Sequence, residues 1–163
     1  MIDWTVFWIE AAVITMLFTG AILIPLCKNP LWWIHDYPED IQEEYFKTHK
    51  RVPVSVKSKT VFLKKGFALL LALAVLVLLS KLAGADGFLS GFAISYGLWS
   101  VINWYDCFIL DWVFFANIKK IRLPGTEHMN KAYHQKWYHF KRALIGAALG
   151  LVPSLIVGAL CLV

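Results

Sequence analysis

Apolar residues gather into four long stretches along the chain, separated by segments rich in charge. The stretches cover residues 4–27, 66–83, 88–115 and 143–163. A bilayer core about 30 Å thick requires about 20 helical residues, and each stretch comes close to that length or exceeds it. Helices are favoured over the strands of a barrel, because the stretches lack a strict alternation of apolar and polar residues. The pattern therefore predicts an all-α, polytopic membrane protein, a four-transmembrane-helix bundle that forms a single integral membrane domain over residues 1–163.

The positive charges indicate how these helices are oriented. Fifteen of the 16 Lys and Arg residues fall in the two connecting segments, 28–65 and 116–142, and only Lys81 lies elsewhere. Lys and Arg are retained on the cytoplasmic side during insertion. We therefore expect both segments to be cytoplasmic and both ends of the chain to face outward (N-out, C-out) in the plasma or inner membrane. The first cation is Lys28, which is unlike a cleaved signal peptide, so the first span is expected to be retained.

The composition agrees with a membrane protein and argues against nucleic acid as a partner. Hydrophobic residues make up 59% of the chain, well above the share in soluble domains. A net charge of +5 would favour nucleic-acid binding in a soluble protein, but the retention of cations in the cytoplasmic segments already accounts for it. The three cysteines, Cys27, Cys107 and Cys161, show no C-x-x-C spacing and predict no disulfide framework.

Both connecting segments are expected to be ordered. Asn29 and Pro30 have the cap-then-proline order of a helix start. Residues 38–51 carry acidic residues at their beginning and basic residues at their end, which suits the dipole of an amphipathic helix. In the second segment Thr126 is the expected helix cap, and no helix breaker follows before Pro153. We therefore predict a second helix that runs unbroken from the cytoplasm into the fourth span.

The third apolar stretch carries the polar side chains that most suggest chemistry. On a helical projection Tyr96, Ser100, Asn103 and Asp106 fall within about 120° of arc, and Asp111 lies at the edge of this face. An ionisable group at membrane depth is costly and is therefore a functional hypothesis. The alternative is that both aspartates reach the inner interface, where water is available, and that Asp111 simply pairs with Lys119, Lys120 or Arg122. We predict Asp106 and Asp111 as acids, bases or metal ligands, with Tyr96 and Asn103 orienting a ligand.

The two cytoplasmic segments add further candidates on the same side of the membrane. We predict His134 and His139 as catalytic partners of the two aspartates, and His35, Glu127 and Arg122 as ligand-binding residues. Imidazole and carboxylate groups suit zinc, iron or manganese, but their spacing matches no H-E-x-x-H motif. The sequence therefore leaves both the metal and the cofactor undetermined.

Three functions remain open from the sequence. The first is an integral membrane enzyme or binding protein with a polar pocket at the cytoplasmic leaflet, acting on a lipid or another apolar small molecule. The second is a small oligomeric transporter or channel subunit that uses Glu10 in the first span. The third is a non-catalytic accessory subunit of a larger membrane complex. Small residues at every fourth position of the last span would suit a homodimer in each case; they are Gly146, Gly150, Ser154 and Gly158.

Overall fold

The computed structural model describes residues 1–51 and 59–162, and this part of the chain is all-α, as predicted. Six α-helices occur in it: α1 (Trp4–Lys28), α2 (Glu39–Thr48), α3 (Lys59–Leu82), α4 (Phe88–Tyr105), α5 (Asn130–Tyr133) and α6 (Lys136–Leu160). Two short 3-10 helices, Pro30–Asp36 and Lys119–Ile121, lie in the connecting segments. A π-helix, Asp106–Phe115, directly continues α4.

Two helical segments of the described chain are long and apolar enough to cross a membrane. They are Trp4–Lys28, which is α1, and Asn130–Leu160, which contains α5 and α6. These segments correspond to the first and last of the four predicted spans. Leu69–Leu82 of α3 forms a further apolar helical segment among the described residues. The four-span bundle and its orientation remain predictions.

The chain forms two compact units. The first comprises Met1–Val13, Pro53–Val101 and Ala147–Val163, and the second comprises Ile14–Val52 and Ile102–Gly146. Three helices, α1, α4 and α6, therefore contribute residues to both units.

The first unit is organised around the turn between α3 and α4. Gly84 has a φ of +85°, and a Cβ there would lie 2.7 Å from the Met1 carbonyl oxygen, so the position requires glycine. The Asp3 N–H donates to the Ala83 carbonyl at 2.9 Å, which attaches the start of the chain to this turn. The connection between α3 and α4 is thus a tight turn.

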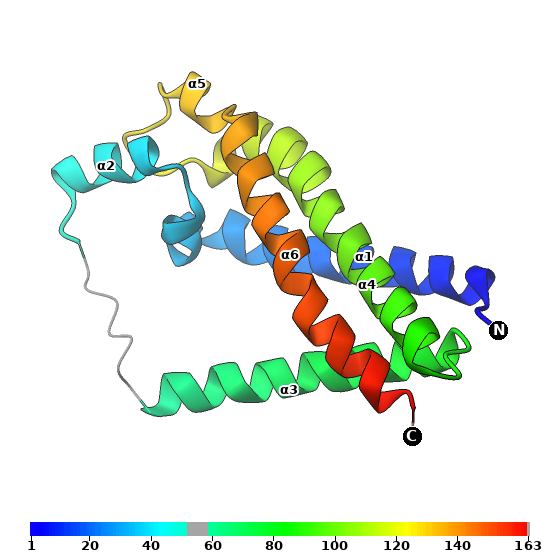
Figure 1. The fold of residues 1–163 in the computed structure, drawn as a ribbon. Coiled ribbons are helices and arrows are strands. Elements are labelled where there is room, and N and C mark those ends of the chain that lie inside the picture. The colour runs from blue at the N-terminus through cyan, green and yellow to red at the C-terminus, as the bar shows by residue number, and fades with distance from the viewer. Residues whose placement is uncertain (52–58, 163) are drawn as a thin grey trace. The chain divides into compact units, whose positions relative to one another are not determined.

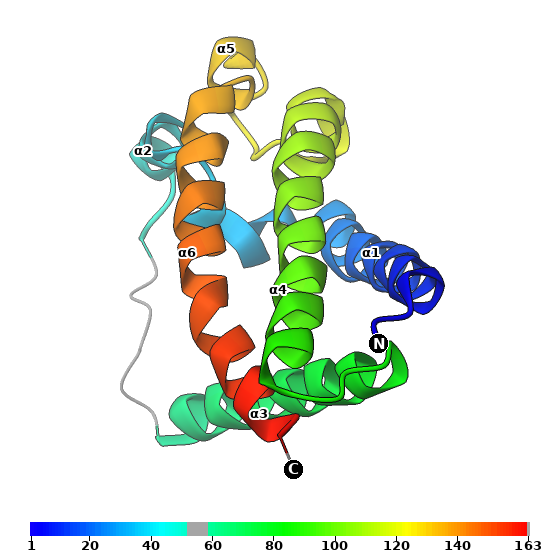
Figure 2. The same ribbon diagram turned by 45° about the vertical axis from the view of Figure 1, so that its right-hand side comes forward.

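In the first unit the beginning of α4 lies beside the end of α6 (Figures 1 and 2). A Cβ on Gly158 would lie 2.9 Å from the Phe88 carbonyl oxygen, and one on Gly91 would lie 2.7 Å from Cβ of Cys161. Small residues thus allow the two helices to approach closely. Gly150 likewise faces the Trp99 ring, so this part of the small-residue stripe is used within the chain.

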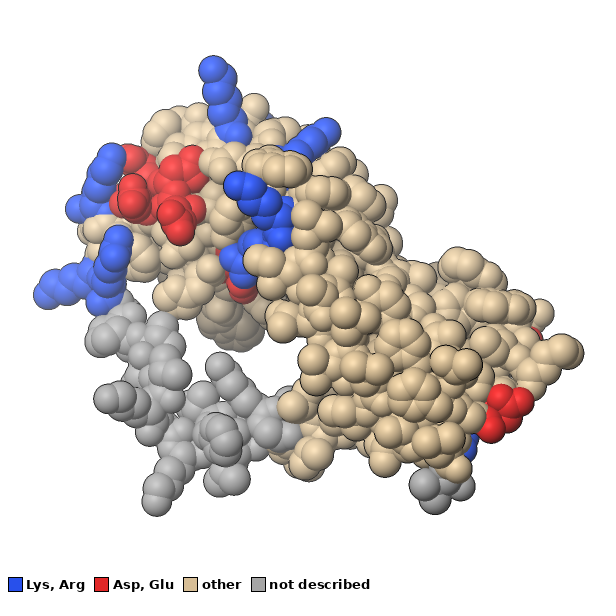
Figure 3. Space-filling view, viewed as in Figure 1, with Lys and Arg blue, Asp and Glu red and all other residues tan. Residues whose placement is uncertain are grey.

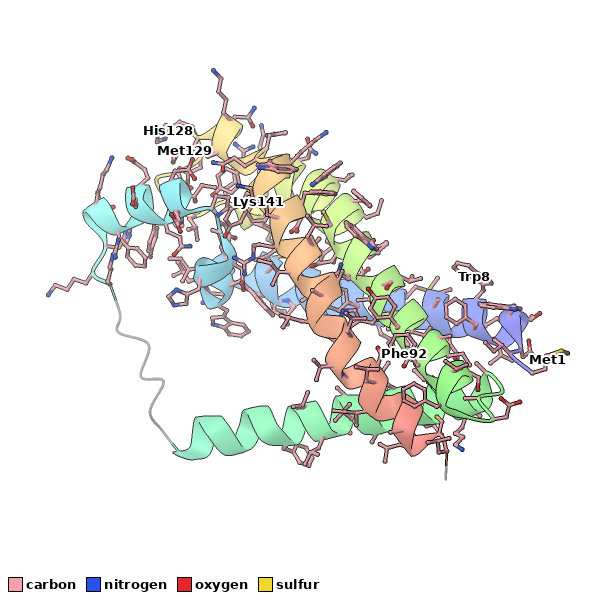
Figure 4. The ribbon with its side chains drawn as sticks, viewed as in Figure 1. Met1, Trp8, Phe92, His128, Met129 and Lys141 are labelled. Carbon is pink, nitrogen blue, oxygen red and sulfur yellow. The ribbon has the colours of Figure 1, made fainter. Side chains whose placement is uncertain are left out.

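The second unit contains a buried core built from the two connecting segments. Its members are Leu26, Ile34, Tyr37, Ile41, Tyr45, Phe115, Ile121, Leu123, Ala132 and Tyr133. The Tyr37 hydroxyl donates to the Ile121 carbonyl at 2.5 Å, and the Gln135 amide donates to Asp40 at 2.6 Å. Figure 1 shows α2 and α5 near each other, and Figure 4 shows Met129 beside α5, where it packs against this core. Both connecting segments are therefore ordered, as expected, over their described residues.

Charged side chains gather over the connecting segments of the second unit. Figure 3 shows Lys, Arg, Asp and Glu side chains over α2, α5 and the beginning of α6. Most of the surrounding surface in that view carries no charge. This mixed charge agrees with a water-exposed region that is not uniformly cationic.

Two local predictions about the connecting segments need correction, and one is confirmed. The Asn29 side chain accepts the Leu31 N–H at 3.1 Å, so the predicted cap is present. The amphipathic helix is shorter than predicted, because Pro38 precedes its first residue and His49 is already extended. The unbroken helix from Thr126 is wrong: Thr126 instead buries its hydroxyl against the Leu123 carbonyl and the Tyr133 hydroxyl, and a turn at His134 separates α5 from α6.

Candidate functional site

The second unit contains a cavity of about 470 Å³, which is within the usual range for small-molecule sites. Its lining comes mostly from α1, the 3-10 helix Pro30–Asp36, the end of α4, the π-helix and the beginning of α6. They are Phe18, Ile22, Leu26, Trp33, Asp36, Tyr37, Asn103, Asp106, Cys107, Asp111, Phe115, His139, Arg142 and Ala143.

One part of the cavity lining is apolar. Phe18, Ile22 and Leu26 recur every fourth residue of α1, so they share one helix face. Tyr37 and Phe115 add aromatic rings whose centroids are 4.9 Å apart in an edge-on arrangement. This lining suits the apolar body of a ligand.

The π-helix explains why both predicted aspartates line the cavity. In an α-helix residues five apart point about 140° away from each other. Hydrogen bonds of a π-helix join residues five apart, so Asp106 and Asp111 lie much nearer to one helix face than they would in an α-helix. The Ala116 N–H donates to the Asp111 carbonyl, which is a bond of this kind. A continuous α-helix, as predicted for 88–115, would have left Asp111 at the edge of the polar face.

The Asp111 carboxylate lies within hydrogen-bond distance of His139. Its Oδ2 lies 2.9 Å from Nδ1 of His139, and the ring is only 5% exposed. Because the carboxylate accepts a hydrogen bond from Nδ1–H, the neutral ring carries a lone pair on Nε2. That Nε2 is buried and has no hydrogen-bond partner among the described residues. The structure therefore brings Asp111 and His139 into contact, and their catalytic role remains a prediction.

The cation that lines the cavity, Arg142, is already engaged. Its guanidinium donates to Asp36 Oδ1 at 2.8 Å and to the Tyr138 hydroxyl at 2.7 Å. Both members of the Arg142–Asp36 pair are about half exposed. Exposed pairs of this kind contribute little to stability. We therefore assign to the Arg142–Asp36 pair a role in balancing charge at the cavity.

Asp106 and Asn103 differ in how their polar atoms are used. The Asn103 amide donates to the Ala143 carbonyl at 3.0 Å, and its Oδ1 occupies the space that a Cβ on Gly146 would take. Asn103 thus joins the end of α4 to the beginning of α6. The Asp106 carboxylate, by contrast, has no hydrogen bond or ion pair to any residue that the structure describes.

Five of the predicted site residues do not line this cavity. His35, Glu127 and His134 are exposed, and His134 Nδ1 lies 2.7 Å from the Asn130 carbonyl. Arg122 donates to the Glu127 carbonyl at 2.8 Å and to Asn130 at 2.7 Å, and its guanidinium lies over the Tyr133 ring. Tyr96 belongs to the first unit, where its hydroxyl donates to the Ala147 carbonyl at 3.4 Å. The structure thus unites Asn103, Asp106, Asp111 and His139 but not the other five.

Two charged lining residues were not among the predicted site residues. Arg142 lies three positions after His139 on α6, so helical spacing alone would have placed both on one face. Asp36 follows the exposed His35 and lies in a 3-10 helix whose orientation the sequence does not reveal.

Metal binding and similarity to known proteins give no further assignment. Within residues 1–51 and 59–162, no three His, Cys, Asp or Glu side chains are grouped so as to hold a metal ion. The chain matches no family model, no curated protein and no solved structure.

Proposed function

We propose that this chain is a multi-pass integral membrane protein with four spans, and that its cavity binds a lipid or another apolar small molecule with a polar end. The protein is then a membrane enzyme or binding protein whose site opens at the cytoplasmic leaflet. The observation that carries the proposal is one cavity that combines an apolar lining from α1 with Asp106, Asp111 and His139.

The apolar surface of α1 supports insertion into a membrane. Leu17 and Met16 are 69% and 75% exposed, and Trp8 is 61% exposed. An apolar surface of this kind is costly in water and is normally covered by lipid or by a partner. Together with the concentration of cations in the connecting segments, it favours a cytoplasmic position for the second unit's core.

The Asp111–His139 pair supports acid–base chemistry at the polar end of the ligand. A carboxylate on Nδ1 fixes the tautomer and the orientation of the ring. Nε2 of His139 can then accept a proton from a group bound in the cavity, as a general base does. Asp106 provides a second carboxylate for the same ligand.

The ligand can be identified by mass spectrometry of small molecules that co-purify with the protein in detergent. We expect a stoichiometric apolar molecule on the wild-type protein and its loss from Asp106→Asn, with expression unchanged. Glu43→Gln is the matched control, because Glu43 is an exposed carboxylate of α2 that does not line the cavity. Equal retention by the wild type and Asp106→Asn would remove Asp106 from the site.

A second candidate function, an oligomeric transporter or channel subunit, is favoured by Glu10 of α1. This residue is only 8% exposed, and both carboxylate oxygens lack hydrogen-bond partners among the described residues. An isolated carboxyl group within a span is typical of a proton or cation pathway. Flux into proteoliposomes that falls to background in Glu10→Gln, but not in Asp106→Asn, would favour this function over the first.

A further inference from the structure

We infer that the polar end of the ligand is a cationic amine rather than a phosphate, a carboxylate or a hydroxyl group. This inference rests on the proposed function, because it concerns the ligand of the same cavity. It is carried by the charge of the lining residues and by the hydrogen-bonding groups that they leave unused.

The lining residues carry an excess of negative charge. Three carboxyl groups, Asp36, Asp106 and Asp111, stand against the single guanidinium of Arg142, so with all three ionised and His139 neutral the lining carries a net charge of −2. Arg142 is held by Asp36, so it compensates that carboxylate first. Asp106 and Asp111 remain to be balanced, and a ligand cation would do so.

The groups left unused at the cavity are hydrogen-bond acceptors. The Asp106 carboxylate has no partner among the described residues, and Nε2 of His139 carries a lone pair while Nδ1–H donates to Asp111. Both atoms require a donor. An ammonium group supplies up to three N–H donors and a positive charge together, whereas a hydroxyl group supplies one donor and no charge.

An anionic headgroup fits the same lining poorly. The cation at the cavity is engaged by Asp36 and Tyr138, and an anion would meet Asp106 without compensation. Two other cations of the second unit are used elsewhere: Arg122 donates to the Glu127 carbonyl and to Asn130, and the Lys136 ammonium lies 5.2 Å from the Trp112 ring centroid. The aromatic rings of Phe18, Trp33 and Phe115 are compatible with a cation as well as with an apolar body.

The inference can be tested with three probes of equal chain length: dodecylamine, 1-dodecanol and dodecyl phosphate. The probes are mixed in equal amounts with the purified full-length protein in a non-ionic detergent, and the adducts are counted by native mass spectrometry. We expect the amine adduct to exceed the phosphate and alcohol adducts by about tenfold or more. Asp106→Asn should abolish this preference, and Glu43→Gln should retain it.

Cavity-filling variants separate a failure of this inference from a failure of the proposed function. Ala143→Phe places a ring in the cavity, and Ile22→Trp does the same from α1 if the first variant does not fold. If these variants suppress binding but the phosphate or alcohol binds as well as the amine, the inference is overturned and the proposed function stands. If the wild type binds no probe, or if filling the cavity changes no adduct, the proposed function fails as well.

Discussion

At the scale of single residues, the two ring nitrogens of His139 have different surroundings. Nδ1 is paired with Asp111, whereas Nε2 has no partner in the described part of the chain. The first contact orients the ring, and under the proposed function the second atom is the one that contacts the ligand. A substitution of His139 that keeps a hydrogen-bonding group at the position of only one ring nitrogen can separate the structural contact from the ligand contact.

We predict opposite effects for two substitutions of His139. In His139→Asn the amide can take the position of Nδ1 and still donate to Asp111, so thermal stability should remain close to wild type while amine binding falls about tenfold. In His139→Gln the amide reaches the position of Nε2, and the loss of the buried contact to Asp111 should lower the free energy of unfolding by about 1–3 kcal/mol. Melting curves and native mass spectra of both variants check this, and the reverse order would assign the functional contact to Nδ1.

Tyr37 should contribute to stability through a single buried hydroxyl. Its side chain is fully enclosed and donates to the Ile121 carbonyl, so Tyr37→Phe leaves that carbonyl unpaired and should cost about 1–3 kcal/mol. Tyr45→Phe is the matched control, because the Tyr45 ring is also buried but its hydroxyl makes no hydrogen bond to a described residue. Thermal unfolding in detergent compares the two, and equal losses would contradict the assignment.

The same hydroxyl predicts how stability depends on alkaline pH. Burial raises the pKa of Tyr37 above its usual value, so the folded protein keeps the hydroxyl protonated where the unfolded chain ionises. The unfolded state then binds fewer protons, and stability falls as the pH rises above about 10. Tyr37→Phe should make this decline shallower; an unchanged slope in alkaline melting curves would show that other groups cause it.

At the scale of helices, the apolar pattern predicted where most long helices lie but not their internal geometry. The helices α1, α3, α4 and α6 fall within or around the predicted stretches, and the Asn29 cap was recognised because its residue order is local information. The π-helix was not predicted, since the apolar period of 88–115 is also compatible with a continuous α-helix. Its geometry is what aligns Asp106 with Asp111.

The candidate site was predictable only where its residues share a helix. Asn103, Asp106 and Asp111 were found as one polar face. His139 was found among several histidines, but nothing in the sequence separates it from His134, because the turn between α5 and α6 depends on tertiary packing around Thr126 and Tyr133. Asp36 reaches the cavity through the folding of a connecting segment, which periodicity does not describe.

The close approach of α4 and α6 predicts which glycine is sensitive to substitution. In Gly158→Ala the new methyl group would meet the Phe88 carbonyl oxygen at 2.9 Å, a backbone atom that cannot rotate away, and we expect a loss of about 1–3 kcal/mol. Gly20→Ala is the control within a helix, because its Cβ meets only the end of the Ile24 side chain at 3.8 Å and should be neutral or slightly stabilising. Similar melting temperatures for the two variants would contradict close helix packing at Gly158.

At the scale of the whole molecule, the proposed topology assigns the connecting segments and the α3–α4 turn to opposite sides of the membrane. Exposed residues report on each: Glu43 and Glu127 for the segments, and Asp86 for the turn. Each is replaced singly by cysteine in a chain whose native cysteines are serine. An impermeant thiol reagent should label Asp86→Cys on intact cells, and label Glu43→Cys and Glu127→Cys only after permeabilisation.

The outcome of this labelling decides between four spans and fewer. Labelling of all three positions from one side would contradict the orientation inferred from the cations, and it would place the cavity in a different compartment. The homodimer through Gly146, Gly150, Ser154 and Gly158 remains a prediction at this scale. Within the chain, Gly146, Gly150 and Gly158 of α6 already pack against residues of α4. A dimer through this face would have to displace those contacts.

Cys107 provides a native thiol at the cavity. It is a free thiol, only 1% exposed, and it belongs to the cavity lining. Exchange at a buried thiol is slow, so in a chain with serine at Cys27 and Cys161, Cys107 would retain only those members of a library of small disulfides that enter the cavity and fit its lining. The captured fragments would then outline the shape and polarity of the natural ligand from its binding site alone.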